Sequence, residues 1–441
     1  MYTKESGLCI QASKDIVDAL TVKPKLKNTY SKKVESFPLY QKKDDGTLSV
    51  PRFWAEKELK IIVDVPQGLP LEHITFHGEL REPQKKIIDE VLPKILNFGG
   101  GVLSLPCGYG KTCIAIFLFS ILKLKTLVLV HKTFLLNQWI ESIKKFTNAK
   151  VGLIQQNTID IDDKDIVIGM LQSVSMKDYH HSIFEKFDFL VVDEVHNVAT
   201  KVFSKALSKI NTKYTLGLSA TPERDDGLSK VFYWYLGEMI YKMDKVIDTD
   251  VRVNLIHYSI DPGEAKSELN KFKEYRTRAG ELNLSLMLTN ISQVISRNKL
   301  IVDTLKNILV QEPQRNVLVL SSRIDQLEIL KKQFDNLQTR IGTDYYIGKM
   351  KEKELKKAEE KQVLFATYEM VNEGFDLPKL NTLIFATPRS KIEQAVGRIM
   401  RTKGEIKPLI IDIVDELSSF KGQSYKRIRY YKNLNYQIHH F

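Results

Sequence analysis

The hydrophobic pattern changes at about Phe76, where short apolar runs begin to alternate with amphipathic segments. Continuous apolar runs predict buried strands, and the first set occupies residues 101–105, 126–130, 165–170 and 187–194. The segments between them, 111–123, 134–146 and 202–210, carry apolar residues at helical spacing. Alternating strands and helices predict a parallel sheet with helices on both faces.

A second set of apolar runs follows at residues 251–260, 316–322, 362–367, 381–387 and 407–413, which predicts a second α/β unit like the first. Between its first two strands, a long polar stretch without proline predicts a helical insertion. A lysine-rich stretch broken by prolines precedes both units. We therefore predict three parts: an N-terminal accessory module at 1–75, a first α/β domain at 76–248, and a second at 249–441 with the insertion at about 262–310.

The composition is that of a folded, basic protein. Hydrophobic residues make up 43% of the 441 residues and charged residues 27%, which is enough apolar material for two cores. The 66 Lys and Arg residues against 54 Asp and Glu give a net charge of +12, which is consistent with a polyanionic partner. The most apolar segment, 113–124, is too short for a membrane span, the N-terminus lacks a secretory pattern, and three cysteines do not make a disulfide framework. We expect a soluble intracellular protein.

The segment LPCGYGKT, which follows the first predicted strand and precedes a helical pattern, has the context of a phosphate-binding loop. Gly108 and Gly110 allow backbone angles that let successive N–H groups converge on phosphate oxygens at a helix N-terminus. Lys111 is then expected to reach the terminal phosphates, and the Thr112 hydroxyl to bind Mg²⁺. The general motif has glycine where this chain has Leu105. The alternative is a glycine turn with an incidental lysine.

The run FDFLVVDEVH ends a strongly apolar strand in Asp193, Glu194 and His196. Open α/β sheets bind their ligands at the carboxyl ends of strands. Asp193 is a candidate Mg²⁺ ligand, and Glu194 is a candidate base for the attacking water in phosphoryl transfer. As an isolated motif it could be only the solvated end of a buried strand, but a phosphate loop followed by a carboxylate strand indicates a nucleotide hydrolase.

Five further segments lie in a fixed order around these two motifs: LREPQ at 80–84, LVLVHKTFLLNQW at 127–139, LSATPERDDG at 218–227, VLFATYEMVNEGFDLP at 363–378 and QAVGRIMR at 394–401. Together with the phosphate loop and DEVH they resemble the motif set of a superfamily 2 helicase of DExH type. The resemblance is closest to the XPB-like branch, which includes helicases of large DNA viruses. It implies two tandem RecA-like parallel-sheet domains.

The resemblance also implies residue roles. Gln84 is similar to the residue that reads adenine upstream of the phosphate loop. The implied ATP-binding set is Arg81, Gln84, Pro106, Cys107, Gly108, Tyr109, Gly110, Lys111, Thr112, Asp193, Glu194, His196, Gly374, Asp376, Gln394, Arg398 and Arg401. The implied catalytic residues are Lys111, Glu194, Arg398 and Arg401, and the implied metal ligands are Thr112 and Asp193.

Arg398 and Arg401 are spaced i and i+3, which places both on one face of a helix. They belong to the domain that lacks the phosphate loop. Because arginine forks onto phosphate oxygens, closure of the two domains around ATP would bring an arginine finger to the γ-phosphate. The alternative is a solvated basic helix.

The helicase resemblance assigns nucleic acid contacts to Lys132, Thr133 and Thr367, and coupling between nucleic acid and ATP to Ser219 and Thr221. Hydroxyls and amides can grip phosphate without reading sequence. Each serine or threonine could instead cap a helix or a turn.

Two basic segments offer further nucleic acid contacts. The insertion contains Lys266, Lys271, Lys273, Arg276 and Arg278, which form either a projecting grip or a solvated face. The C-terminal tail mixes basic and aromatic residues, a composition suited either to base stacking or to a terminal helix packed on the second domain. The tail residues concerned are Tyr425, Lys426, Arg427, Arg429, Tyr430, Tyr431 and Lys432.

These features predict an ATP- and Mg²⁺-dependent DNA helicase or translocase that couples ATP hydrolysis to movement along a strand. One alternative is an RNA-directed helicase, because backbone contacts do not separate DNA from RNA. The other, from a different class, is a nucleic acid clamp that does not hydrolyse ATP. The presence of Lys111, Glu194, Arg398 and Arg401 argues against the clamp.

Overall fold

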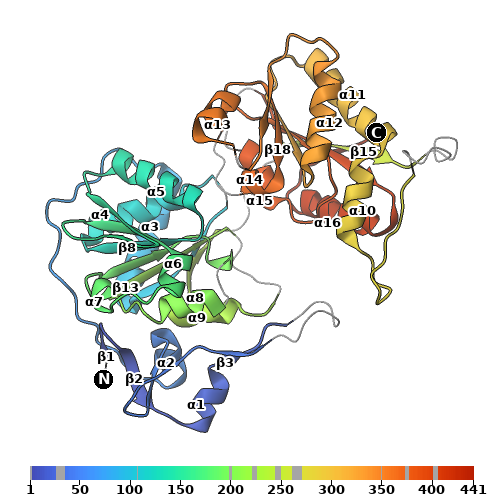
Figure 1. Ribbon diagram of the computed structural model, residues 1–441. Coiled ribbons are helices and arrows are strands. Elements are labelled where there is room, and N and C mark those ends of the chain that lie inside the picture. Colours follow the sequence, from blue (N-terminus) through green and yellow to red (C-terminus); the bar gives the residue numbers. More distant parts are fainter. Residues whose placement is uncertain are drawn as a thin grey trace. The chain divides into compact units, whose positions relative to one another are not determined.

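The computed structural model describes residues 2–25, 35–106, 108–197, 201–220, 226–243, 250–260, 271–348, 350–372, 377–400 and 406–441. The chain forms two compact units, Met1–Asp244 and Lys245–Phe441. Each unit is built around its own sheet (Figure 1).

The first unit begins with a small antiparallel sheet in the order β1-β2-β6-β5. Its strands are β1 (Tyr2–Thr3), β2 (Gly7–Gln11), β5 (Gln41–Lys42) and β6 (Thr47–Val50); helices α1 (Lys14–Ala19) and α2 (Arg52–Glu58) and the pair β3 (Thr21–Val22) and β4 (Phe37–Pro38) complete it. This module packs on α9 (Ser229–Leu236), where Trp54 meets Trp234 edge to face at 6.5 Å. The Arg52 Nη1 group also donates to the Lys213 carbonyl at 2.9 Å, so the module is tied to the larger part of its unit.

The main sheet of the first unit has the order β10-β9-β11-β8-β12-β13-β7-β14. All neighbouring strands are parallel except β10 and β9. The strands are β7 (Gly100–Ser104), β8 (Thr126–Val130), β9 (Val151–Gln155), β10 (Thr158–Asp160), β11 (Ile166–Met170), β12 (Phe189–Val192), β13 (Tyr214–Ser219) and β14 (Met239–Lys242).

Helices cover both faces of this sheet (Figure 1). One face carries α3 (Glu82–Phe98), α4 (Lys111–Leu122) and α5 (Thr133–Phe146), and the other carries α6 (Leu171–Met176), α7 (Ser182–Glu185), α8 (Lys201–Leu207) and α9. Strand β8 feeds both cores, because Leu127 packs with one and Val128 with the other. This alternation follows from the two-residue period of a strand and explains why the strand is apolar throughout.

The second unit has a seven-stranded sheet in the order β17-β18-β16-β19-β20-β15-β21, in which every described pair is parallel. The strands are β15 (Arg252–Tyr258), β16 (Val317–Ser321), β17 (Thr343–Tyr346), β18 (Val363–Thr367), β19 (Thr382–Phe385), β20 (Leu409–Asp415) and β21 (Gln437–His440). Helices α11 (Ile295–Gln311) and α12 (Ile324–Asp335) pack on one face. The other face holds α13 (Glu352–Glu359), α14 (Tyr368–Asn372), α15 (Glu393–Ile399) and α16 (Ser418–Asn433).

The predicted α/β class with two parallel-sheet units is confirmed. The helical prediction for the insertion is wrong over residues 271–283, which contain no helix; α10 (Leu284–Ser292) follows them. Thr277 and Gly280 form a tight turn there, and the Arg276 Nη1 group donates to the Gly280 carbonyl at 2.9 Å. A glycine with a positive φ at this turn favours the loop over a continuous helix.

Candidate active site

The phosphate loop lies between β7 and α4, as its sequence context predicts. Gly108 and Gly110 adopt positive φ angles of 86° and 80°, and Gly110 is the N-cap of α4. A Cβ atom at Gly110 would overlap the amide nitrogen of Gln84, so a side chain at this position of positive φ would displace the Gln84 amide. The loop therefore brings the N-terminus of a 12-residue helix to an open turn, which is the backbone arrangement that binds anions.

Gln84 and Arg81 hold this loop in place from the start of α3. The Gln84 Nε2 group donates to the Tyr109 carbonyl at 3.1 Å, while its Oε1 accepts from the Arg81 backbone N–H at 3.0 Å. The Arg81 guanidinium donates to the Gly108 carbonyl at 3.3 Å. Gln84 is only 4% exposed. Both ends of its amide are thus used within the protein, and each end keeps capacity for one further hydrogen bond, because the nitrogen has two N–H groups and the oxygen two lone pairs.

Lys111 is the first residue of α4 and is partly buried beside Pro106 and Thr112, which are also partly buried. Its ammonium group donates to the Leu105 carbonyl at 3.1 Å. This bond turns the lysine back over the loop, where its charge also acts on Asp193. A phosphate in the loop would therefore meet the lysine ammonium and the helix N-terminus together.

Asp193 and Glu194 follow directly after β12, in the middle of the sheet. The Asp193 side chain is 6% exposed, and it accepts hydrogen bonds from the Trp139 indole at 2.9 Å and from the Glu194 backbone N–H at 3.0 Å. Glu194 has a φ of 52°, the left-handed region that non-glycine residues rarely adopt. Strain of this kind is typical of residues that are held for function.

Burial and the repulsion between two adjacent carboxylates dominate the electrostatics of this pair. Burial raises the pKa of Asp193 to about 6, and the neighbouring charge of Glu194 raises it as well, while the Trp139 hydrogen bond and the Lys111 charge act in the opposite direction. Glu194 Oε2 is buried and makes no hydrogen bond within the described part of the chain. It lies 3.3 Å from His196 Nδ1, but that nitrogen is closer to Ser219 Oγ, at 3.0 Å.

This donor set fits a divalent cation bound together with a nucleotide. The carboxylate of Asp193 offers hard oxygen ligands, which hard cations prefer, and the orphaned Glu194 oxygen next to it can accept a hydrogen bond from a water molecule. Among the described residues, no group of three or more His, Cys, Asp or Glu side chains could hold a metal by itself. A cation here would complete its shell with the Thr112 hydroxyl, phosphate oxygens and water, the usual arrangement for Mg²⁺ in phosphoryl transfer.

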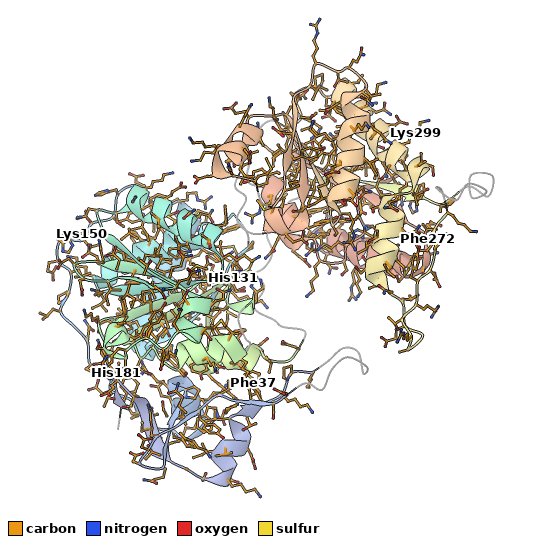
Figure 2. The ribbon with its side chains drawn as sticks, in the orientation of Figure 1. Phe37, His131, Lys150, His181, Phe272 and Lys299 are labelled. Atoms are coloured by element: carbon orange, nitrogen blue, oxygen red, sulfur yellow. The ribbon has the colours of Figure 1, made fainter. Side chains whose placement is uncertain are left out.

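The predicted nucleic acid contacts of the first unit lie at the start of α5. Lys132 is the N-cap of this helix, and Thr133 is exposed on its first turn. His131, immediately before them, has a buried Nδ1 with no hydrogen bond among the described residues (Figure 2). Burial lowers the pKa of His131 to about 4, with a further contribution from the Lys132 charge. It is therefore neutral at physiological pH.

In the second unit, Thr367 ends β18 and is 8% exposed. Arg398 and Gln394 both lie on α15. Arg398 is 7% exposed, and its Nε group donates to the Val371 carbonyl at 2.9 Å. The predicted site residues Cys107, Thr221, Gly374, Asp376 and Arg401 lie outside the described residues, as does Lys266 of the insertion.

The tail forms α16, which packs on the second unit, so the stacking hypothesis is wrong for Arg427 and Tyr431. Both are buried, and both bond to the carboxylate of Asp412. Tyr425 is 61% exposed, and Lys426 and Arg429 are exposed. In the insertion, the side chains of Lys271, Lys273, Arg276 and Arg278 are exposed, so the projecting grip and the solvated face both remain open.

Sequence reasoning missed Trp139 as a site residue. A tryptophan at an apolar helix position usually belongs to a core, and Trp139 does pack in one. The available signal was its place in the segment 127–139 together with the need of a buried indole N–H for an acceptor.

Two family models match the chain: "Type III restriction enzyme, res subunit" over residues 77–224 and "Helicase conserved C-terminal domain" over residues 300–403. A protein of Acanthamoeba polyphaga mimivirus named "Putative ATP-dependent RNA helicase" is 35% identical over 435 residues, which cover 96% of this chain and 82% of the relative. The "DNA 3'-5' translocase XPB2" of Sulfurisphaera tokodaii is 26% identical over 83% of this chain and 88% of its own length.

Solved structures show the same fold at low identity. A type ISP restriction-modification enzyme bound to DNA matches 82% of this chain and 31% of its own, with a TM-score of 0.58 and 18% identity. Yeast Dbp5 bound to RNA matches 80% of this chain and 89% of its own, with a TM-score of 0.55 and 14% identity.

The fold and the matches together define an ATP-hydrolysing helicase enzyme that acts on nucleic acid. The chain belongs to the superfamily 2 helicases and is related to the helicases of large DNA viruses. No helix within the described ranges is long and apolar enough to cross a membrane.

Proposed function

We propose that this helicase is an Mg²⁺-dependent motor that moves along a DNA strand and unwinds duplex or displaces bound material. The observation that carries the ATPase part is the adjacent pair that follows β12: Asp193 is buried and feels the Lys111 charge, and the buried Oε2 of Glu194 has no hydrogen bond among the described residues. The preference for DNA is supported by the relative that is named as a DNA translocase.

In this proposal, the phosphate loop from Pro106 to Thr112 holds the phosphates of ATP. Its backbone N–H groups and Lys111 compensate the phosphate charge, and Thr112 and Asp193 hold Mg²⁺. When bound, Mg²⁺ neutralises the charge on the terminal phosphates. Arg81, Gln84 and Tyr109 form the base side of the site, and one N–H of the Gln84 amide also donates to the Tyr109 carbonyl.

Glu194 is proposed as the base. Its Oε2 is buried and lacks a hydrogen bond among the described residues, so it is available to accept one from a water molecule. That bond orients the water for attack on the γ-phosphate, and the Glu194 carboxylate receives the proton of the water. His196, which lies 3.0 Å from Ser219 Oγ, links this strand end to the next strand in the sheet. On this basis we assign coupling to Ser219, and we assign it to Thr221, which lies outside the described residues, from the helicase resemblance alone.

The second domain, proposed as residues 249–441, contributes Gly374, Asp376, Gln394, Arg398 and Arg401 to ATP. The two arginines act on the γ-phosphate. In the structure, Arg398 donates to a backbone carbonyl and is almost fully buried, so this role requires the guanidinium to become accessible. The first domain, proposed as 76–248, carries the rest of the ATP site, and residues 1–75 form an accessory module.

Lys132, Thr133 and Thr367 are proposed to grip the sugar–phosphate backbone. Such contacts position a strand but carry no sequence information. They also do not distinguish DNA from RNA, because they need no 2′-hydroxyl. RNA is therefore the second candidate substrate, and it is supported by the printed name of the mimivirus relative.

The test compares stimulation of ATP turnover by single-stranded DNA and RNA of the same sequence, and by duplex DNA, at one fixed salt concentration. Glu194→Gln serves as the control for contaminating ATPases. The proposal expects stimulation by DNA to exceed that by RNA. Greater stimulation by RNA would replace DNA with RNA as the substrate, and tight binding without stimulated turnover would support the non-hydrolysing clamp.

A further inference from the structure

Trp139 links helix α5 to the end of strand β12 in the first unit. It lies on α5, yet its indole N–H donates to Asp193 Oδ2, at the end of β12, at 2.9 Å. Strand β8 runs beside β12 in this sheet, and its Leu129 carbonyl accepts from the Asp193 backbone N–H at 3.0 Å. The side chain of Asp193 is thus held by a helix, while its backbone is held by the strand that leads into that helix.

The Asp193 carboxylate accepts two hydrogen bonds and keeps unused lone pairs for a further partner. Oδ2 accepts from Trp139, and Oδ1 accepts from the Glu194 backbone N–H. Each carboxylate oxygen has about two lone pairs, so each keeps one for a further partner. The backbone bond comes from the adjacent residue, so within the described chain Trp139 is the side chain that fixes the rotation of this carboxylate from outside its own strand.

Trp139 has little freedom to let the carboxylate move. It is 1% exposed and packs among Leu136, Ile143 and the apolar residues of β8 and β11. The bond therefore transmits the position of α5 to Asp193. Residue 139 lies six residues after the first residue of α5, or roughly 9 Å along the helix at 1.5 Å per residue.

The N-terminal end of α5 carries the proposed nucleic acid contact. Lys132 is the N-cap of α5 and Thr133 is its first residue, so a strand gripped there acts on the same helix that carries Trp139. A helix is stiff over this length, so a displacement at its first turn reaches the indole. A physical connection between the strand grip and the metal-binding carboxylate then consists of one helix and one hydrogen bond.

We propose that Trp139 is a positioning residue that orients Asp193 for Mg²⁺ and reports to it whether α5 is engaged by nucleic acid. The inference rests on the proposed function, which makes Asp193 a metal ligand and Lys132 and Thr133 strand contacts. It goes further because it names the connection between the two. Partners of metal ligands typically change metal affinity by 10- to 100-fold when removed.

The test measures the Mg²⁺ concentration at half-maximal binding of a fluorescent ADP analogue, with and without the single-stranded oligonucleotide that stimulates turnover. Trp139→Phe keeps an aromatic ring and removes the N–H group. Trp54→Phe is the matched control, because it makes the same change at another buried tryptophan of the same unit. Asp193→Asn tests the metal site itself, and thermal unfolding is followed for each variant.

We expect Trp139→Phe to raise the Mg²⁺ midpoint about tenfold or more and to remove the shift that the oligonucleotide causes in the wild type. Trp54→Phe should change neither. If Trp139→Phe behaves as the wild type while Asp193→Asn is impaired, Trp139 is only a core residue and the inference fails alone. If Asp193→Asn also behaves as the wild type, the proposed metal site fails with it.

A second measurement covers the case in which Trp139→Phe does not fold. The chain has three tryptophans, so replacing Trp54 and Trp234 by phenylalanine leaves Trp139 as the sole indole. Its emission should change when Mg²⁺ and ADP are added together, and again when the oligonucleotide is added. Emission that responds to neither addition would overturn the inference.

Discussion

Each unit has a pair of carboxylates, in or next to an inner strand of its sheet, that the fold buries wholly or in part, and the two pairs differ in how far the fold pairs them. Asp412 and Asp415 of β20 are 0% exposed and fully paired. Asp193 and Glu194, after β12, are also largely buried, but the oxygen Glu194 Oε2 has no hydrogen bond among the described residues. The two units thus offer a direct comparison between completed and uncompleted buried charge.

In the second unit, each of the two buried carboxylates forms an ion pair with an arginine. Arg427 donates to Asp412 from Nε at 2.8 Å and from Nη2 at 2.7 Å, and the Tyr431 hydroxyl donates to the same carboxylate at 2.9 Å. Arg297 forks onto Asp415 at 2.6 and 2.9 Å. Because Asp412 and Asp415 each have an arginine as counter-charge within the fold, these ion pairs hold α16 and α11 to the sheet.

In the first unit Lys111 does not form an ion pair with either carboxylate of the pair. Lys111 bonds to the carbonyl of Leu105 and influences Asp193 only through its charge. Burying a carboxylate without a counter-charge is unfavourable, so a fold retains this arrangement where a cation or a reacting group supplies the missing partner. The difference teaches that the pairing of a buried charge, more than its burial, separates structural carboxylates from those available for chemistry.

The largest expected effect is on catalysis in the first unit. Glu194→Gln should reduce stimulated ATP turnover by about 10²- to 10⁴-fold, because a general base contributes that much, while ATP still binds. Lys111→Ala should lose turnover and ATP binding together, because it removes charge compensation at the phosphates. Single-turnover hydrolysis and nucleotide binding distinguish the two.

Neither substitution should lower thermal stability by much, since neither side chain completes a buried ion pair. Near-normal turnover in either variant, or a large loss of stability in Glu194→Gln, would remove the contrast between the two units.

The next effect is on stability in the second unit. Arg427→Met should reduce the free energy of unfolding by about 3–5 kcal/mol, because it leaves Asp412 buried without its counter-charge. Denaturant unfolding of the full chain measures this loss. Arg429→Met is the matched control on an exposed position of the same helix and should change stability by less than about 0.5 kcal/mol. Equal stability of the two variants would mean that the Asp412 pair is not structural.

A smaller effect depends on pH. Burial raises the pKa of Asp193 from 3.8 to about 6, so the folded state favours the protonated carboxyl. Its contribution to stability is therefore fully present below about pH 3.8 and is lost as the pH rises through about 6. In metal-free buffer, wild type relative to Asp193→Asn should lose roughly 1–3 kcal/mol of unfolding free energy between pH 4 and pH 7.

Denaturant unfolding of both proteins at each pH isolates this term, because the other titrating groups are shared. A difference that stays constant with pH would show that Asp193 is not held as an uncompensated buried carboxylate.

The smallest expected effect is a recovery. Replacing the whole pair, with Asp412→Leu and Arg427→Met together, should restore stability to within about 1–2 kcal/mol of the wild type, since buried ion pairs are often no more stable than apolar residues of similar size. The measurement is the same denaturant titration, compared with Arg427→Met alone. A double variant as unstable as the single one would mean that Arg427 stabilises through packing or through its bond to the Arg389 carbonyl.

Several strands escaped the sequence reading. Strand β13 carries Gly217 and Ser219 within its apolar run, so it read as part of a motif and was not predicted as a strand. Strand β9 alternates between buried and partly buried residues and carries a glycine in its short apolar run, and β21 is mostly exposed. Strands of this kind are defined by the neighbours they pair with, whether inside the sheet as for β9 or at its edge as for β21, and the local pattern does not show that pairing.

The amino-acid sequence alone determined the α/β class, the central strands of both sheets and the phosphate loop, because hydrophobic period and glycine placement act over adjacent residues. Only the tertiary structure decided that Trp139 bonds to Asp193, that Gln84 and Arg81 hold the phosphate loop, and that Arg427 is buried. These contacts join residues far apart in the chain. Their partners are chosen by strand order and helix rotation, which no local pattern contains.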